Sequence, residues 1–161
     1  MPPVTLLVCG EPMRGDDALA LAVLDALPPT ARALADVRHV GQLMPDDLHP
    51  HASPVIVLDA VAGPAPGTLV DVPLDRLAAS SARGAFTPAS SHALPLPITL
   101  GIVERLAGGL PDGRFVGIGA ADYTLGAGLS PAVRNAIAPC AARLSAWLTL
   151  LAGQEGPAAC A

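Results

Sequence analysis

Two short runs of uninterrupted apolar residues constrain the fold of this chain more than any other feature. Val4–Cys9 reads VTLLVC and is ended by Gly10, and Val55–Leu58 reads VIVL and is ended by Asp59. A strand without a polar face is buried on both sides, which is typical of parallel sheets. The two runs therefore predict central strands of a sheet that is covered on both faces.

Segments with helical periodicity lie between the predicted strands. Residues 18–27 place apolar side chains at the i, i+3, i+4 and i+7 positions of one helix face. Further helices are predicted over residues 95–107 and from Ser130, where a capping residue precedes a proline. Weaker strands are predicted at 36–40, 66–74 and 113–120. Strands that alternate with helices predict an α/β fold of three layers: a mostly parallel, twisted sheet of about five strands with helices on both faces.

The length of the chain predicts one domain. Its 161 residues are 52% hydrophobic, which is enough for a single buried core. We expect this domain to span residues 1–152 and residues 153–161 to form a disordered tail. Residues 75–93 are rich in Ser and Ala and predict a surface loop that could contain a helical turn, and loops of this length are often functional.

Composition excludes several classes of function. The net charge is −5, with only 9 Lys and Arg and 2% aromatic residues, so neither a phosphate-binding surface nor a base-stacking surface is expected. The three cysteines are too scattered for a disulfide framework, which favours a reducing compartment. No signal peptide and no membrane-spanning run are recognisable. We expect a cytoplasmic monomer that binds neither nucleic acid nor membrane.

Three side chains are candidates for a functional site. In open α/β sheets, ligands bind at the carboxyl ends of the strands. Asp17 opens the helix after the first strand, Asp59 ends a central strand, and His92 lies in the loop that enters the next helix. Two carboxylates and an imidazole suit a divalent transition metal with coordination positions left open.

Each candidate also has a structural explanation. Acidic residues are favourable at a helix start, and Asp16 is the more natural capping group of the Asp16–Asp17 pair. Asp59 could accept a hydrogen bond in a turn, and His92 could cap a helix. The remaining histidines, His39, His49 and His51, are expected in solvent.

The common enzyme motifs do not occur. The first predicted turn, CGEPMRGDDA, lacks G-x-G-x-x-G and carries two acids where a pyrophosphate would need N–H groups. The chain has no G-x-S-x-G elbow, Walker motif or H-E-x-x-H. Nucleotide binding and the most frequent hydrolase classes are therefore not expected.

Five segments resemble the hydrogenase maturation endopeptidases in their order along the chain. VTLLVCGEPMRGDDALALAVLDAL resembles the family's first strand, turn, acid pair and helix. VGQLMPDDL resembles a Gln-Leu-x-Pro-acid segment, and PVIVLDAVAGPAPGTL a strand that ends in Asp before a Pro-Gly turn. SSHALPLPITLGIVERLAGGLPD resembles the His-bearing loop and helix, and RFVGIGAADYTLGAGLSPAVRNAI the last strand and terminal helix. The resemblance covers residues 4–150.

This resemblance implies a specific activity. Such an endopeptidase removes a short C-terminal extension from the large-subunit precursor of a nickel–iron hydrogenase after nickel has been inserted. The three metal-contacting residues of the family fall on Asp17, Asp59 and His92. The nickel would be carried by the substrate and not permanently bound, and both an aspartic-type and a metal-dependent mechanism fit these residues.

Two positions depart from the family pattern. Glu11 stands where Asn is common and could add a carboxylate near the metal, and Ala18 stands where Gly is usual. Ala18 would be strained if the turn needed a positive φ. These departures motivate two alternatives: a noncatalytic assembly factor that binds the metal-loaded large subunit, and a plain metal-binding or small-molecule module that shares only the fold.

Overall fold

A five-stranded sheet forms the centre of the computed structural model, which describes residues 4–48, 53–80 and 95–154. The strand order is β2-β1-β3-β5-β4. Strands β1, β2, β3 and β5 are parallel, and the edge strand β4 runs antiparallel to β5. The strand bounds are β1 Val4–Cys9, β2 Ala35–Gly41, β3 Val55–Val61, β4 Leu69–Pro73 and β5 Gly113–Gly119.

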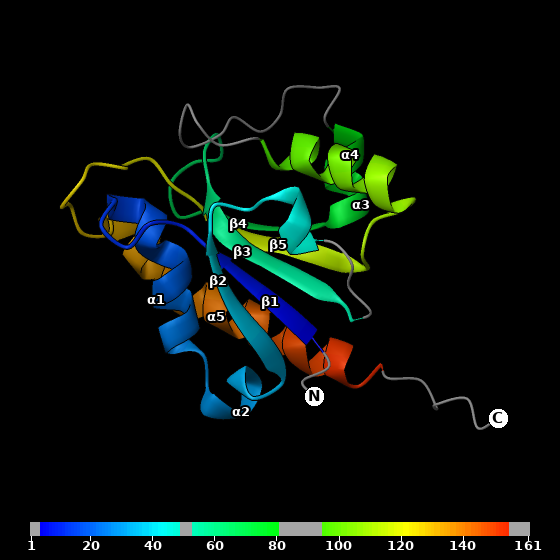
Figure 1. Ribbon diagram of the computed structural model, residues 1–161. Coiled ribbons are helices and arrows are strands. Elements are labelled where there is room, and N and C mark those ends of the chain that lie inside the picture. Colours follow the sequence, from blue (N-terminus) through cyan, green and yellow to red (C-terminus); the bar gives the residue numbers. More distant parts are fainter. Residues whose placement is uncertain (1–3, 49–52, 81–94, 155–161) are drawn as a thin grey trace.

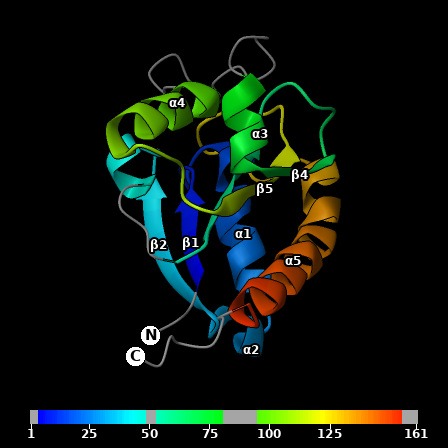
Figure 2. The same ribbon diagram turned by 90° about the vertical axis from the view of Figure 1, so that its right-hand side faces the viewer.

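Helices cover both faces of the sheet (Figure 1). One face is covered by α1 and α5 and the other by α3 and α4, as the rotated view also shows (Figure 2). The α-helices are α1 Leu19–Ala26, α2 Pro29–Arg32, α3 Leu74–Ala79, α4 Leu96–Ala107 and α5 Pro131–Ala152. Two 3-10 turns, η1 Gly15–Ala18 and η2 Pro45–Leu48, follow β1 and β2. The predicted three-layer α/β fold is confirmed.

Alternation along the strands divides the interior into two cores. In β1, Leu6 and Val8 pack against α1 and α5, whereas Leu7 and Cys9 pack into the core that contains α3 and α4. Successive side chains of a strand point to opposite faces, so an uninterrupted apolar run serves both cores at once. No helix of the described residues is long and apolar enough to cross a membrane.

Two predicted boundaries were wrong. Strand β3 continues beyond Asp59, because its pairing with β5 extends to Val61 opposite Gly119. The loop predicted to begin at residue 75 starts instead with α3, whose Leu74 and Leu77 are buried against the core. Leu74 falls within the predicted strand 66–74, and the Ser- and Ala-rich composition of the following stretch concealed Leu77. The remainder of the predicted loop, residues 81–94, lies outside the described residues.

Candidate functional site

Asp59 occupies a polar position near the carboxyl end of an otherwise apolar strand. Its neighbours at alternate positions, Val57 and Val61, both pack into the core that contains α3 and α4, so the Asp59 side chain points to the same face. Cys9, near the end of the adjacent strand β1, faces this core as well. Asp59 thus lies near the carboxyl ends of β1 and β3, where these strands lead into their connecting loops.

The environment of Asp59 favours its protonated form. Burial raises the pKa of its carboxyl to about 7, although the N–H of Ala60 donates a hydrogen bond to Oδ1 at 2.7 Å. The negative charge of Asp17 raises this pKa further. The turn η1, which carries Asp17, packs against β3, which carries Asp59, so two carboxylates 42 positions apart in the sequence are brought to the same edge of the sheet.

Asp17 reaches the site from the turn η1. Its Oδ2 accepts a hydrogen bond of 2.8 Å from the N–H of Glu11, and this bond and the charge of Arg14 oppose the increase in pKa that burial causes. The net effect is still a raised pKa for Asp17. Gly10 makes the arrangement possible, because it adopts φ +103 and a Cβ at this position would overlap the backbone carbonyl of Asp17.

Asp16, the neighbour of Asp17, has a structural role that differs from the predicted one. Its carboxylate is fully buried and accepts hydrogen bonds from the N–H groups of Ala121 and Asp122, both at 3.2 Å. It also accepts from the N–H and the hydroxyl of Ser130, at 2.6 and 2.9 Å. Burial opposes ionisation, but these bonds hold the pKa of Asp16 below its ordinary value. The prediction that Asp16 caps its own helix was wrong: it joins η1 to the loop before α5.

Other acidic groups add negative charge to the same region. Burial raises the pKa of the Cys9 thiol, and the charges of Asp59 and Asp47 raise it further. Asp47 belongs to η2 and accepts a hydrogen bond of 2.8 Å from the N–H of Met44. The carboxyl edge of the sheet therefore concentrates carboxylates from the connections after β1 and β2 and from β3 itself. This concentration of negative charge favours a cationic ligand.

The third predicted site residue, His92, lies outside the described residues, as do His49 and His51. His39, on β2, is exposed as predicted. Within residues 4–48, 53–80 and 95–154, no group of three or more His, Cys, Asp or Glu side chains converges as a metal site. The structure thus brings together two of the three predicted donors.

The two departures from the family pattern cause no distortion of the turn. Ala18 adopts φ −77 and ψ −2, an ordinary helical conformation, so its side chain is unstrained. The Glu11 side chain is exposed and Oε1 accepts a hydrogen bond of 3.3 Å from the N–H of Met13. The charge of Glu11 nevertheless raises the pKa of Asp17, so this residue contributes to the acidic character of the site.

One residue near the site was missed from the sequence. Tyr123, in the loop after β5, has a buried hydroxyl, and its pKa is raised to about 12 by burial and by the charges of Asp17 and Asp59. A signal existed, because this is the one Tyr of the chain and it lies in a glycine-containing loop after the last predicted strand. Strand-end reasoning applies to that loop as well.

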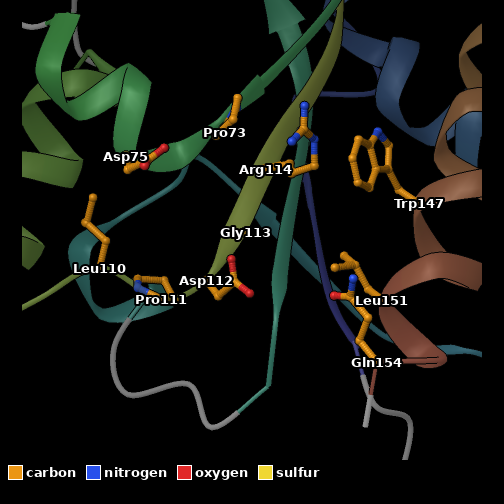
Figure 3. A pocket seen from close by; sticks show the side chains of 10 residues that line it. All are labelled: Pro73, Asp75, Leu110, Pro111, Asp112, Gly113, Arg114, Trp147, Leu151 and Gln154. Atoms are coloured by element: carbon orange, nitrogen blue, oxygen red, sulfur yellow. The ribbon is translucent and has the colours of Figure 1, made fainter. Parts of the chain in front are cut away.

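A hollow lies at the opposite, amino edge of the sheet (Figure 3). It has a volume of about 420 Å³ and is lined by residues of β5, α5 and the segment before β5, among them Arg114 and Trp147. Both side chains are already engaged: the Arg114 guanidinium stacks 3.9 Å from the centre of the Trp147 ring, and each donates a hydrogen bond of 2.8 Å to Asp71. This cluster ties α5 to β4 and β5 and has a structural role.

Comparisons with known proteins give the fold a context. No protein-family model matches the chain, and no curated protein matches it. Among solved structures, the hydrogenase maturating endopeptidase HybD from E. coli superimposes with a TM-score of 0.70 and 22% sequence identity, covering 91% of this chain and 92% of that chain. The chain has the fold of the hydrogenase maturation proteases.

Other solved structures agree with this assignment of the fold. The [NiFe] hydrogenase maturation protease HybD from Thermococcus kodakarensis has a TM-score of 0.68 and 19% identity, with 90% of this chain and 98% of that chain covered. An endopeptidase from Escherichia coli has a TM-score of 0.67 and 23% identity, with 91% and 93% covered. Each similarity covers at least 90% of this chain, so the resemblance inferred from the sequence is confirmed at the level of the fold.

Proposed function

We propose that this protein is an endopeptidase that removes the C-terminal extension of a nickel–iron hydrogenase large-subunit precursor after nickel insertion. One observation carries the proposal: η1 and β3 bring Asp17 and Asp59 to the same carboxyl edge of the sheet, in a fold shared with hydrogenase maturation proteases. A fold alone does not define an activity, so Asp17 and Asp59, called the acidic pair below, provide the chemical argument.

The nickel ion is proposed to arrive with the substrate. Asp17, Asp59 and His92 would complete the coordination of a nickel ion that the cysteine thiolates of the precursor already hold. The paired carboxylates support this proposal, because each has a raised pKa that a bound cation would lower. Two carboxylates and one imidazole would leave coordination positions open for ligands from the precursor, and such a set suits inspection of a metal that another protein holds.

The proposed chemistry is hydrolysis of one peptide bond. The substrate's nickel would align the scissile peptide and polarise its carbonyl, while one of the two carboxylates accepts a proton from the attacking water. The raised pKa values of Asp17 and Asp59 bring both carboxyls closer to neutral pH, which suits general acid–base catalysis. Cleavage would therefore depend on prior insertion of nickel.

Exposed apolar side chains around the acidic pair support a protein substrate. Met13, Met44 and Leu125 are 60%, 46% and 70% exposed, and they belong to the connections that follow β1, β2 and β5. Large apolar side chains that gather on one edge of a protein are typical of interaction surfaces. We define these three residues as the apolar rim.

Intact-mass measurement of the large subunit tests the proposal. The precursor, loaded with nickel or free of nickel, is incubated with the protein, and a decrease in mass is expected only with nickel. Replacement of Asp17, Asp59 or His92 by Ala is expected to leave the precursor uncleaved. Asp25→Ala, which changes an exposed aspartate on α1, is the matched control and should cleave normally.

Two results would contradict the proposed activity. Normal processing of the precursor by all three site variants would refute the assignment of these residues to the site. A stable complex between the protein and the nickel-loaded precursor, with no change in mass, would instead establish a noncatalytic assembly factor.

A further inference from the structure

Tyr123 is held beside the acidic pair by contacts on the amino-terminal side of the residue. Asp16 accepts hydrogen bonds from the N–H groups of Ala121 and Asp122, and the Asp16 N–H donates to the carbonyl of Asp122 at 2.7 Å. These bonds join the loop after β5 to the turn that carries Asp17. The position of Tyr123 relative to Asp17 is therefore set by backbone groups of both segments.

A second set of contacts holds the loop on the carboxyl-terminal side of Tyr123. Leu125 forms an antiparallel bridge with Arg14, and the N–H of Gly126 donates a hydrogen bond of 2.8 Å to the carbonyl of Met13. Figure 1 shows this loop, in yellow, beside the start of α1. Tyr123 thus lies between two anchored segments.

The Tyr123 hydroxyl has no hydrogen-bond partner among the described residues, although it is buried. The ring packs against the core that contains α1 and α5, which orients the side chain. Burial and the charges of Asp17 and Asp59 raise the pKa of Tyr123 to about 12, so the phenol keeps its proton at neutral pH and its O–H can donate. Buried polar groups in folded proteins are nearly always paired, so an unpaired one calls for an explanation.

We infer that binding of a polypeptide against Asp17 and Asp59 uncovers the Tyr123 hydroxyl, which then donates a hydrogen bond to a backbone carbonyl of that polypeptide. This inference rests on the proposed function. Every polypeptide substrate carries backbone carbonyls that accept hydrogen bonds. The Tyr123 hydroxyl is a donor for such a carbonyl, whereas the nearby Asp17 and Asp59 carboxylates are acceptors. Tyr123 would thereby orient the peptide backbone next to the two carboxylates.

The substitution Tyr123→Phe tests this role because it deletes only the hydroxyl. We expect kcat/KM for cleavage of the nickel-loaded precursor to fall about tenfold, the effect of one lost hydrogen bond to the substrate. We expect the melting temperature of the free protein to be unchanged or higher, since the hydroxyl has no partner to lose in the part of the chain that the structure describes. A purely structural tyrosine would behave differently, because its loss would lower the melting temperature.

Thr149→Val is the matched control, since it deletes a hydroxyl on α5 that donates a hydrogen bond to the carbonyl of Ser145 within its own helix. It should leave kcat/KM unchanged. Equal kcat/KM for Tyr123→Phe and the unmodified protein would overturn the inference and leave the proposed function intact.

A binding measurement separates the two proposals if the unmodified protein does not cleave. The proposed endopeptidase activity then fails, and the affinity for the nickel-loaded precursor is compared between the unmodified protein and Tyr123→Phe. An affinity about tenfold weaker in the variant would support the hydrogen bond to the polypeptide. Equal affinities, or no binding by the unmodified protein, would overturn it.

Discussion

The carboxylates of Asp16 and Asp17 are consecutive in the chain but have different partners and opposite pKa shifts. Asp16 accepts four hydrogen bonds from the loop before α5, and its pKa is lowered. Asp17 accepts one bond, from the Glu11 N–H, and its pKa is raised. Asp16 and Asp17 therefore combine a structural group and a candidate functional group in one turn.

Replacement by Asn distinguishes the roles of Asp16 and Asp17. Asp16→Asn places an amide against N–H donors and should lower the free energy of unfolding by about 2–4 kcal/mol. Asp17→Asn should leave that free energy unchanged or slightly raised, because burial already disfavours its charge, and should abolish cleavage of the precursor. Urea unfolding at pH 7 measures both. An equal loss of stability in the two variants would contradict the division of roles.

The raised pKa of Asp59 predicts that its contribution to stability depends on pH. A carboxyl with a folded-state pKa of about 7 and an ordinary value of 3.8 is protonated more readily in the folded state. Its stabilisation is fully present below pH 3.8 and is lost as the pH rises through 7. Asp59→Asn, which keeps the acceptor for the Ala60 N–H, should remove this dependence.

At pH 8 we expect Asp59→Asn to be more stable than the unmodified protein by about 2 kcal/mol. The full pKa shift would give a larger difference, but Asp59 is only half-buried, and solvent reduces the effect. The same variant should be inactive on the precursor. Thermal unfolding between pH 5 and pH 8 tests the prediction, and an unchanged difference in stability across that range would refute it.

Gly10 is expected to tolerate no side chain. Gly10→Ala would force a residue with a Cβ into φ +103 and against the carbonyl of Asp17, with a cost of about 2–4 kcal/mol in unfolding free energy and a displaced Asp17. Gly109→Ala is the control, because nothing lies near that position and its φ is not positive. It should change stability by less than about 1 kcal/mol. Comparable effects of both substitutions on unfolding would count against this account of the turn.

Asp71 is predicted to stabilise the fold without affecting catalysis. It pairs with Arg114 and Arg143 and accepts a bond from Trp147, and although burial opposes ionisation, these partners lower its pKa. Its contribution is therefore present above pH 3.8 and is lost as the pH falls through the lowered value. Asp71→Asn should destabilise the protein by about 1–3 kcal/mol at pH 7 while kcat/KM at a permissive temperature stays unchanged. A selective loss of kcat/KM would connect this cluster to the site.

The apolar rim is predicted to contact the precursor. Leu125→Ser should raise KM for the precursor several-fold and leave the melting temperature unchanged, because Leu125 is 70% exposed and its removal from water requires a partner. Leu106→Ser is the matched control, since Leu106 is 78% exposed near the carboxyl end of α4. Equal KM values for the two variants would exclude the rim as a docking surface.

Most of the fold was predictable because its signals are local. The apolar run Val4–Cys9 and the helical periodicity of 18–27 report burial directly, and both correspond to observed elements. The carboxyl end of β3 was less predictable, because its last residues are strand only through pairing with β5. Helix α3 was expected only as a possible turn within a loop, because Leu74 and Leu77 become a helix face only against the core.

The acid pair with which the first helix opens could be recognised from the sequence, as could the carboxylate at Asp59, because a polar residue that interrupts an apolar run is visible without coordinates. The sequence already favoured Asp16 as the structural member of the pair, but only the tertiary structure decided which groups it binds, since they lie 105 to 114 residues away. It also decided that the segments that carry Asp17, Asp59 and Tyr123 meet at one edge of the sheet. Residue types and local periodicity determine the elements, whereas the convergence of charges depends on strand order and loop contacts, which no local pattern encodes.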